Sequence, residues 1–138
     1  QHVFYSHASS INAYALWVDG GATKLDGTLE VDGTTTLSGG LTLSRSAVTS
    51  TPYTVLTSDV IIGVNNGSAT TLNLPAVSAT DIGKVYYIKD ESGAASDSKN
   101  ITVDGSGSEN IDGSTTYVIN TDYGSVTIYN NGSKWLII

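Results

Sequence analysis

A six-residue repeat at residues 25–46 constrains this chain more than any other feature. Written in sixes, the segment reads LDGTLE, VDGTTT, LSGGLT, LSRSAV, with an apolar first position throughout and Gly third in three of four. An alternation of apolar and polar residues predicts extended chain with one apolar face, and it excludes a helix. The Asp-Gly and Ser-Gly pairs predict a bend in each of the first three repeats. The large apolar residues at 25–43 all have odd numbers: Leu25, Leu29, Val31, Leu37, Leu41 and Leu43.

The repeat is too short for one chain to enclose its own apolar face. A β-solenoid buries its core by stacking several coils, and four hexads make little more than one coil of three hexads. Three chains wound about a common axis supply the missing strands. The segment therefore predicts a homotrimer with a triple-stranded, β-helix-like stem, whose axis is filled by the six apolar residues above. The alternative is an ordinary β-meander inside a sandwich.

Composition narrows the class of protein and of partner. Charged residues make up 14% of the chain, and its Gly, Thr, Ser and Val content favours an ordered β protein over disorder or helices. With no cysteine, stability cannot come from disulfides, and association of subunits is the remaining source. The net charge of −7 disfavours nucleic acid and anionic membrane surfaces as partners.

The pattern divides the chain into four segments. We expect an irregular segment at 1–15, the stem at 16–46, a linker at 47–52 and a C-terminal β-sandwich at 53–138. The Asn-Gly pair before Trp135 predicts a closing hairpin, and adjacent Tyr86 and Tyr87 should point to opposite faces of a strand. Eight strands are expected in the last segment, at 53–56, 60–64, 70–74, 84–89, 101–104, 116–120, 125–129 and 135–138.

The C-terminal segment resembles a module found at the C-terminus of bacteriophage fibres. The resemblance covers most of 53–138, and its most specific elements are Ile-Lys-Asp-Glu-Ser-Gly at 88–93 and Ile-Asp-Gly at 111–113. The hexad stem is similar to phage fibre shafts. This resemblance implies a trimeric fibre on the surface of a virus particle, attached to other virion proteins through its N-terminal end. It implies no catalytic residue.

The sequence predicts no enzyme, metal or cofactor. The two histidines, His2 and His7, lie in no nucleophile motif, and Asp-Gly turns account for most of the carboxylates. A saccharide-cleaving tailspike fragment is the weakest alternative. The stretch from Asp104 to Glu109 is rich in oxygen ligands for Ca²⁺ but lacks the spacing of an EF-hand, so we expect a plain surface turn.

Late aromatic residues are the candidates for ligand contact. Tyr and Trp rings beside Asn, Asp and Thr can stack on sugars of a host cell surface; the alternative is that they fill the core or the trimer interface. The candidates are Tyr117, Tyr123, Tyr129 and Trp135. The predicted function is therefore a structural fibre whose tip attaches to host saccharide. A decoration fibre of the capsid or neck with no receptor, and a bacterial adhesin, are the alternatives.

Overall fold

The computed structural model describes residues 23–27 and 29–138, and the protein is all-β. The chain divides into two units, residues 1–40 and 41–138. The expected irregular segment at 1–15 lies outside the described residues. Within them, the elements are β1 (Arg45–Val48), β2 (Tyr53–Thr54), β3 (Ile61–Val64), β4 (Thr70–Asn73), a short 3₁₀ turn η1 (Val77–Ala79), β5 (Val85–Asp90), β6 (Ile101–Asp104), β7 (Thr116–Ile119), β8 (Ser125–Asn130) and β9 (Trp135–Ile137).

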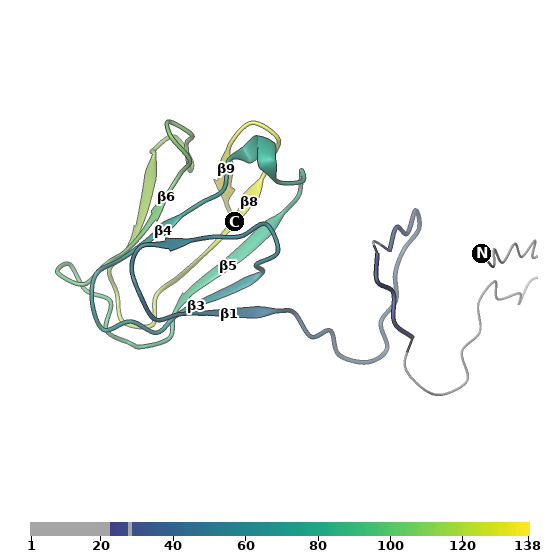
Figure 1. Ribbon diagram of the computed structural model, residues 1–138, viewed down its shortest axis with the longest axis horizontal. Coiled ribbons are helices and arrows are strands. Elements are labelled where there is room, and N and C mark those ends of the chain that lie inside the picture. The colour runs from purple at the N-terminus through teal and green to yellow at the C-terminus, as the bar shows by residue number, and fades with distance from the viewer. Residues whose placement is uncertain (1–22, 28) are drawn as a thin grey trace, which may run out of the picture. The chain divides into compact units, whose positions relative to one another are not determined.

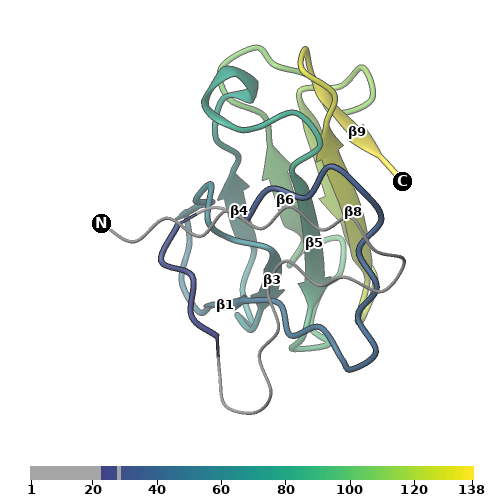
Figure 2. The same cartoon turned by 90° about the vertical axis from the view of Figure 1, so that its right-hand side faces the viewer.

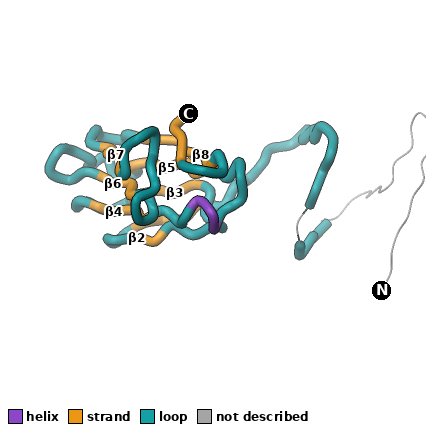
Figure 3. Tube along the Cα trace, turned by 90° about the horizontal axis from the view of Figure 1, so that it is seen from above, coloured by secondary structure: helices purple, strands orange, loops and turns teal. Residues whose placement is uncertain are grey.

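The second unit is a sandwich of two mixed sheets (Figure 1). The five-stranded sheet has the order β1-β3-β5-β8-β9, and the four-stranded sheet has the order β2-β4-β6-β7. Viewed from above, the strands of the two sheets form separate layers (Figure 3). Strand β9, at the C-terminus, forms one edge of the larger sheet (Figure 2).

The first six strands wind between the two sheets instead of forming hairpins. Strands β1, β3 and β5 pair in parallel in one sheet, and β2, β4 and β6 pair in parallel in the other. Each step along the chain therefore crosses to the opposite sheet. Strands β7, β8 and β9 then pair antiparallel with their neighbours. The expected sandwich is present, and β8–β9 is the expected closing hairpin.

The core lies between the two sheets and consists of alternate residues of the strands. In β5, Tyr86 and Ile88 are fully buried, whereas Tyr87 is 44% exposed on the opposite face, as predicted. Trp135 is also fully buried, and its ring centroid lies 5.2 Å from that of Tyr86. Burial of such large side chains is the main stabilising term in a sandwich of this size.

All eight predicted strands are present, with ends that differ by two residues at most. The predicted linker at 47–52 is wrong in its first two residues. Ala47 and Val48 belong to β1, which pairs with β3, and Val48 is buried in the core. The sequence pattern did not predict β1, because no turn signal separates its four residues from the repeat that precedes them. The sandwich thus begins before residue 47.

Candidate functional site

The described part of the stem bends at the predicted pairs. The chain bends at 26–27, 32–33 and 38–39, which are the Asp-Gly and Ser-Gly pairs of the repeat, six residues apart. No strand is formed by the described residues between 23 and 44, because a β-strand needs a partner that a single chain does not provide. The predicted corners are therefore confirmed, whereas the triple-stranded arrangement stays a prediction.

All six predicted axis residues are exposed in the single chain. Their exposed fractions run from 38% for Leu43 to 68% for Leu41. The others lie between these values: Leu25 at 59%, Leu29 at 67%, Val31 at 48% and Leu37 at 58%. We call these six residues the stem row. A row of large aliphatic side chains left in water is unfavourable, and a continuous exposed apolar surface marks a site of association.

Within one chain, no contact or backbone conformation explains why the repeat has glycine at its third position. Gly27, Gly33 and Gly39 do not have the positive φ that favours glycine. A Cβ atom built at any of the three would meet no other atom of the chain within 4 Å. Neither backbone conformation nor an internal contact therefore requires glycine there. Close approach of another backbone is the remaining physical reason for glycine at regular intervals in extended chain.

Four loops meet at one end of the sandwich, which we call the loop end. They are residues 49–52, 65–69, 91–100 and 120–124, and the register places them together. Val48 pairs with Val64 and Val64 with Asp90, and the Asp90 amide donates to the Gly124 carbonyl. Strand β1 begins at the other end of the same sheet. The loop end is thus the end of the sandwich away from the point where the chain enters it.

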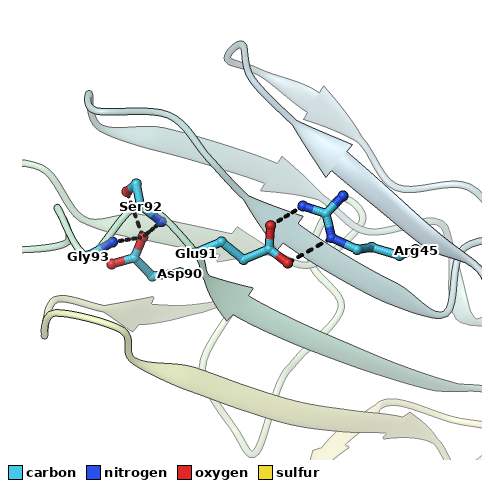
Figure 4. A network of polar contacts seen from close by, with 5 residues as sticks. All are labelled: Arg45, Asp90, Glu91, Ser92 and Gly93. Atoms are coloured by element: carbon cyan, nitrogen blue, oxygen red, sulfur yellow. Dashed lines mark hydrogen bonds and ion pairs between the residues drawn. The ribbon is translucent and has the colours of Figure 1, made fainter.

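A buried carboxylate organises the loop end. Asp90 is 1% exposed, and its Oδ1 accepts hydrogen bonds from Ser92 Oγ at 2.7 Å, Ser92 N at 3.0 Å and Gly93 N at 3.2 Å (Figure 4). Its Oδ2 accepts from Ala95 N and Tyr123 N, each at 3.1 Å. Burial acts to raise the pKa of Asp90, but these hydrogen bonds together outweigh it and hold the pKa below its ordinary value. One carboxylate therefore ties two loops together.

Tyr123 presents the most accessible aromatic ring of the loop end. Its side chain is 62% exposed, and its φ of 55° is unusual for a bulky residue. Lys89 Nζ donates to the Tyr123 carbonyl and lies 5.8 Å from the ring centroid. A Cβ at position 93 would overlap the ring, so Gly93 lets the ring lie against the backbone. The protein holds this ring in place beside a cation while leaving much of it in water.

The other three candidate aromatics do not join Tyr123. Tyr117 packs half-buried against the core from the four-stranded sheet, and Tyr129 is half-buried on the outer face of the five-stranded sheet. Trp135 is fully buried against Tyr86, so its proposed role as a saccharide contact is wrong. The ring has no face left for a ligand. The structure agrees with the alternative prediction that Trp135 is part of the core.

An ion pair lies on the outer face of the five-stranded sheet, next to the loop end. Arg45 donates to the Glu91 carboxylate through Nε, at 2.8 Å, and through a second nitrogen of its guanidinium (Figure 4). This hydrogen bond lowers the pKa of Glu91 and raises that of Arg45. The carboxylate lies directly over Gly63, where a Cβ would overlap it. The pair connects the edge strand β1 to the end of β5.

Sequence reasoning missed a second buried carboxylate, Asp59. It is 4% exposed and accepts hydrogen bonds from Ser46 Oγ at 2.6 Å, and from Tyr53 OH and Leu56 N, both at 2.9 Å. No local pattern predicts its burial, because two of its three donors, Ser46 and Tyr53, come from β1 and β2. Its contacts are structural, and they fix β1 and β2 to the loop before β3.

No metal site emerges from the described residues. Over 23–27 and 29–138, no group of three or more His, Asp or Glu side chains is placed to hold an ion. Glu109, at the end of the oxygen-rich stretch, accepts hydrogen bonds from Val77 N at 2.9 and 3.1 Å. Its carboxylate is therefore engaged in fixing η1. His2 and His7 lie outside the described residues.

Comparison with known proteins does not identify a family for this chain. Neither a protein-family model nor a curated protein matches this sequence. Among the residues that the structure describes, no helix has the length and apolar character needed to cross a membrane. The fold defines the class of protein as a two-sheet β-sandwich that follows a hexad-repeat segment.

Proposed function

We propose that this chain is a structural element of an extended fibre in which three copies share the stem row. The observation that carries the proposal is the exposure of all six aliphatic side chains, between 38% and 68%, in a single chain. Their odd numbering puts them on one side of extended chain, so a partner can cover them all at once. The two units of the chain then have separate roles, association by the stem and display by the sandwich.

Three copies fit this segment better than two. An extended strand with one apolar face presents a narrow row, and three such rows facing a common axis exclude water from it on every side. Two rows facing each other would leave both flanks open. The glycines at 27, 33 and 39 support close packing of the backbones at each corner, since no contact within the chain requires them.

The location proposed for this fibre is the surface of a virus particle. Support comes from the resemblance of residues 53–138 to a C-terminal module of bacteriophage fibres, and of the repeat to fibre shafts. The N-terminal end of the chain would contact other virion proteins. The sandwich would then be the part that is displayed, and its loop end lies opposite the end of the five-stranded sheet at which β1 begins.

At the loop end, we place the contact with host cell-surface saccharide on Tyr123. Its exposed ring can stack on a pyranose face, and the Lys89 ammonium beside it can donate to a hydroxyl or an acidic group. Gly93 and the Asp90 hydrogen bonds hold the ring in place, so little entropy is lost on binding. Display on three copies would multiply a weak affinity per site.

Sedimentation equilibrium of the full chain tests the assembly. A mass of three chains, independent of concentration in the micromolar range, is the expected result. A mass of one chain over the same range would refute the shared stem row. A dimer would keep the stem row as an interface but reject the three-fold arrangement.

The saccharide contact predicts a loss of binding in Tyr123→Ala. We expect at least a tenfold weaker signal on an array of bacterial surface glycans, because stacking on an aromatic ring contributes about 1 kcal/mol or more per site and three sites act together. Ile82→Ala is the matched control, since Ile82 is 77% exposed and precedes β5 at the other end of the sandwich. If the wild-type chain binds no glycan while being trimeric, the fibre has a structural role without a receptor.

A further inference from the structure

The outer face of the five-stranded sheet carries six large apolar side chains, together with the polar residues Arg45, Lys89, Ser125 and Thr127. The pairing register puts Ile61 beside Tyr87, and Val85 beside Tyr129 and then Leu136, all on the side away from the core. Ile138 extends this face, since its amide donates to the Thr127 carbonyl at 3.0 Å. Tyr87 is 44% exposed and Ile138 is 74% exposed, and the others are half-buried. We call these six residues the sheet face: Ile61, Val85, Tyr87, Tyr129, Leu136 and Ile138.

The outer face of the four-stranded sheet has the opposite character. Its register rows read Thr54, Asn73, Asp104 and Thr116, and then Thr71, Thr102 and Val118. All but one of these side chains are polar, as expected of a sheet surface in water. Two sheets of one sandwich thus differ in the surface they present. If the outer faces of both sheets were in water, large apolar side chains on one of these faces would not stabilise the protein.

The last two residues of the stem row, Leu41 and Leu43, come directly before the five-stranded sheet in the chain. Leu41 and Leu43 belong to the same unit as the sandwich, and β1 follows them at the edge of the five-stranded sheet. The ladder already begins at Ser44, whose carbonyl accepts from Ile61 N at 3.1 Å. Odd-numbered residues share one side of a strand, so the side that carries Leu43 continues as Arg45 and then Ala47 on the outer face of this sheet.

The cations on this face have partners within their own chain. Arg45 is paired with Glu91, and Lys89 donates to the Tyr123 carbonyl. Bringing two copies together therefore leaves the charge of Arg45 paired, and the Lys89 ammonium keeps its hydrogen bond toward the loop end. Lys89 and Ser125 lie toward the loop end, whereas Arg45 and Thr127 share the register row of Ile61 and Tyr87.

We infer that the sheet face is the interface between the sandwich domains of neighbouring copies, packed about the axis that the stem row defines. The inference rests on the proposed trimer and adds which of the two sheets faces the axis. The occupant of the sheet face is a second copy of this chain, because Leu41 and Leu43 of the stem row belong to the same unit as the sandwich and come directly before β1 of this sheet. The four-stranded sheet faces water, and the loop end stays free.

Thiol accessibility tests this arrangement, because the chain has no cysteine of its own. Thr127→Cys introduces a thiol between Tyr87 and the C-terminal residue on the outer side of β8. Thr71→Cys is the matched control, a half-buried threonine on the outer face of the other sheet. In full-length trimers, we expect the thiol at position 127 to react with a maleimide at least tenfold more slowly than the thiol at position 71. Adding Leu37→Asp should abolish the difference in the resulting monomer.

Three results would overturn the inference, and they separate it from the proposed trimer. Equal rates in a protein whose native mass is three chains would reject the sheet face as interface while leaving the stem row intact. Protection at position 127 that persists in the monomer would mean that the chain covers its own sheet. A monomeric wild-type protein would reject both the trimer and the interface.

Discussion

Leu37→Asp leaves the protein monomeric at micromolar concentration, if three stem rows share an axis. Each copy would bring one unpaired carboxylate into an apolar environment, which costs several kcal/mol per charge. A cost of about 4 kcal/mol already weakens association about a thousandfold. In the single chain, Leu37 is 58% exposed, so the substitution should not disturb the fold of the sandwich. Native mass spectrometry and far-ultraviolet circular dichroism measure the two properties separately.

Thr36→Asp provides the control for this prediction. Thr36 is the neighbouring residue and is also exposed in the single chain, but its even number puts it on the other side of the extended stem. We expect Thr36→Asp to assemble like the wild type. Both positions face water in one chain, so a difference between the two variants can only come from a partner. Equal assembly of the two variants contradicts the alternation argument.

Asp90→Ala should lower the free energy of unfolding by roughly 3 kcal/mol, since it removes the acceptor of several buried donors at once. The amides of Ala95 and Tyr123 would lose their partner, and the loops that carry them would separate. Asp122→Ala is the control: it changes an exposed carboxylate in one of these loops, and we expect a change of about 0.5 kcal/mol or less. Urea unfolding at one fixed protein concentration measures both. Similar midpoints for the two variants would argue against the role of Asp90.

The pKa of Asp90 gives this prediction a pH dependence with a definite sign. Because its pKa is lower in the folded protein than in the unfolded chain, the carboxylate stabilises the fold fully above the unfolded value of about 3.9. That stabilisation is lost as the pH falls from there through the lower folded value. The difference in urea midpoint between wild type and Asp90→Asn should therefore be largest at neutral pH and shrink below about pH 3.9. A constant difference would show that the charge of Asp90 is not involved.

Within strands, alternation in the sequence was a reliable guide. It predicted that Tyr86 and Tyr87 point to opposite faces, and it identified the closing hairpin and eight strands. These predictions depend only on neighbouring residues, because successive side chains of a strand must point to opposite faces. The corners of the stem, at 26–27, 32–33 and 38–39, were predictable for the same local reason.

The candidate site was predictable only in part. Tyr123 was among the four aromatics chosen, but no sequence pattern favoured it over Trp135. Its placement depends on Lys89 and Asp90 at the end of β5 and on Gly93 in the loop that follows. The Asp-Glu-Ser-Gly stretch at 90–93 predicted a turn, but the burial of Asp90 follows from the pairing of β5 with β3 and β8.

By itself, the sequence determined where eight strands of the sandwich lie, that Tyr86 and Tyr87 point to opposite faces, and that the large apolar residues of the stem alternate with polar ones. Only the tertiary structure decided which strands pair and in which direction. Asn-Gly-Ser joins two strands of one sheet at 131–133, yet the same three residues at 66–68 carry the chain from one sheet to the other. A turn sets the change of direction locally, whereas the partner of a strand is chosen by the apolar surface that pairing buries across the whole sandwich.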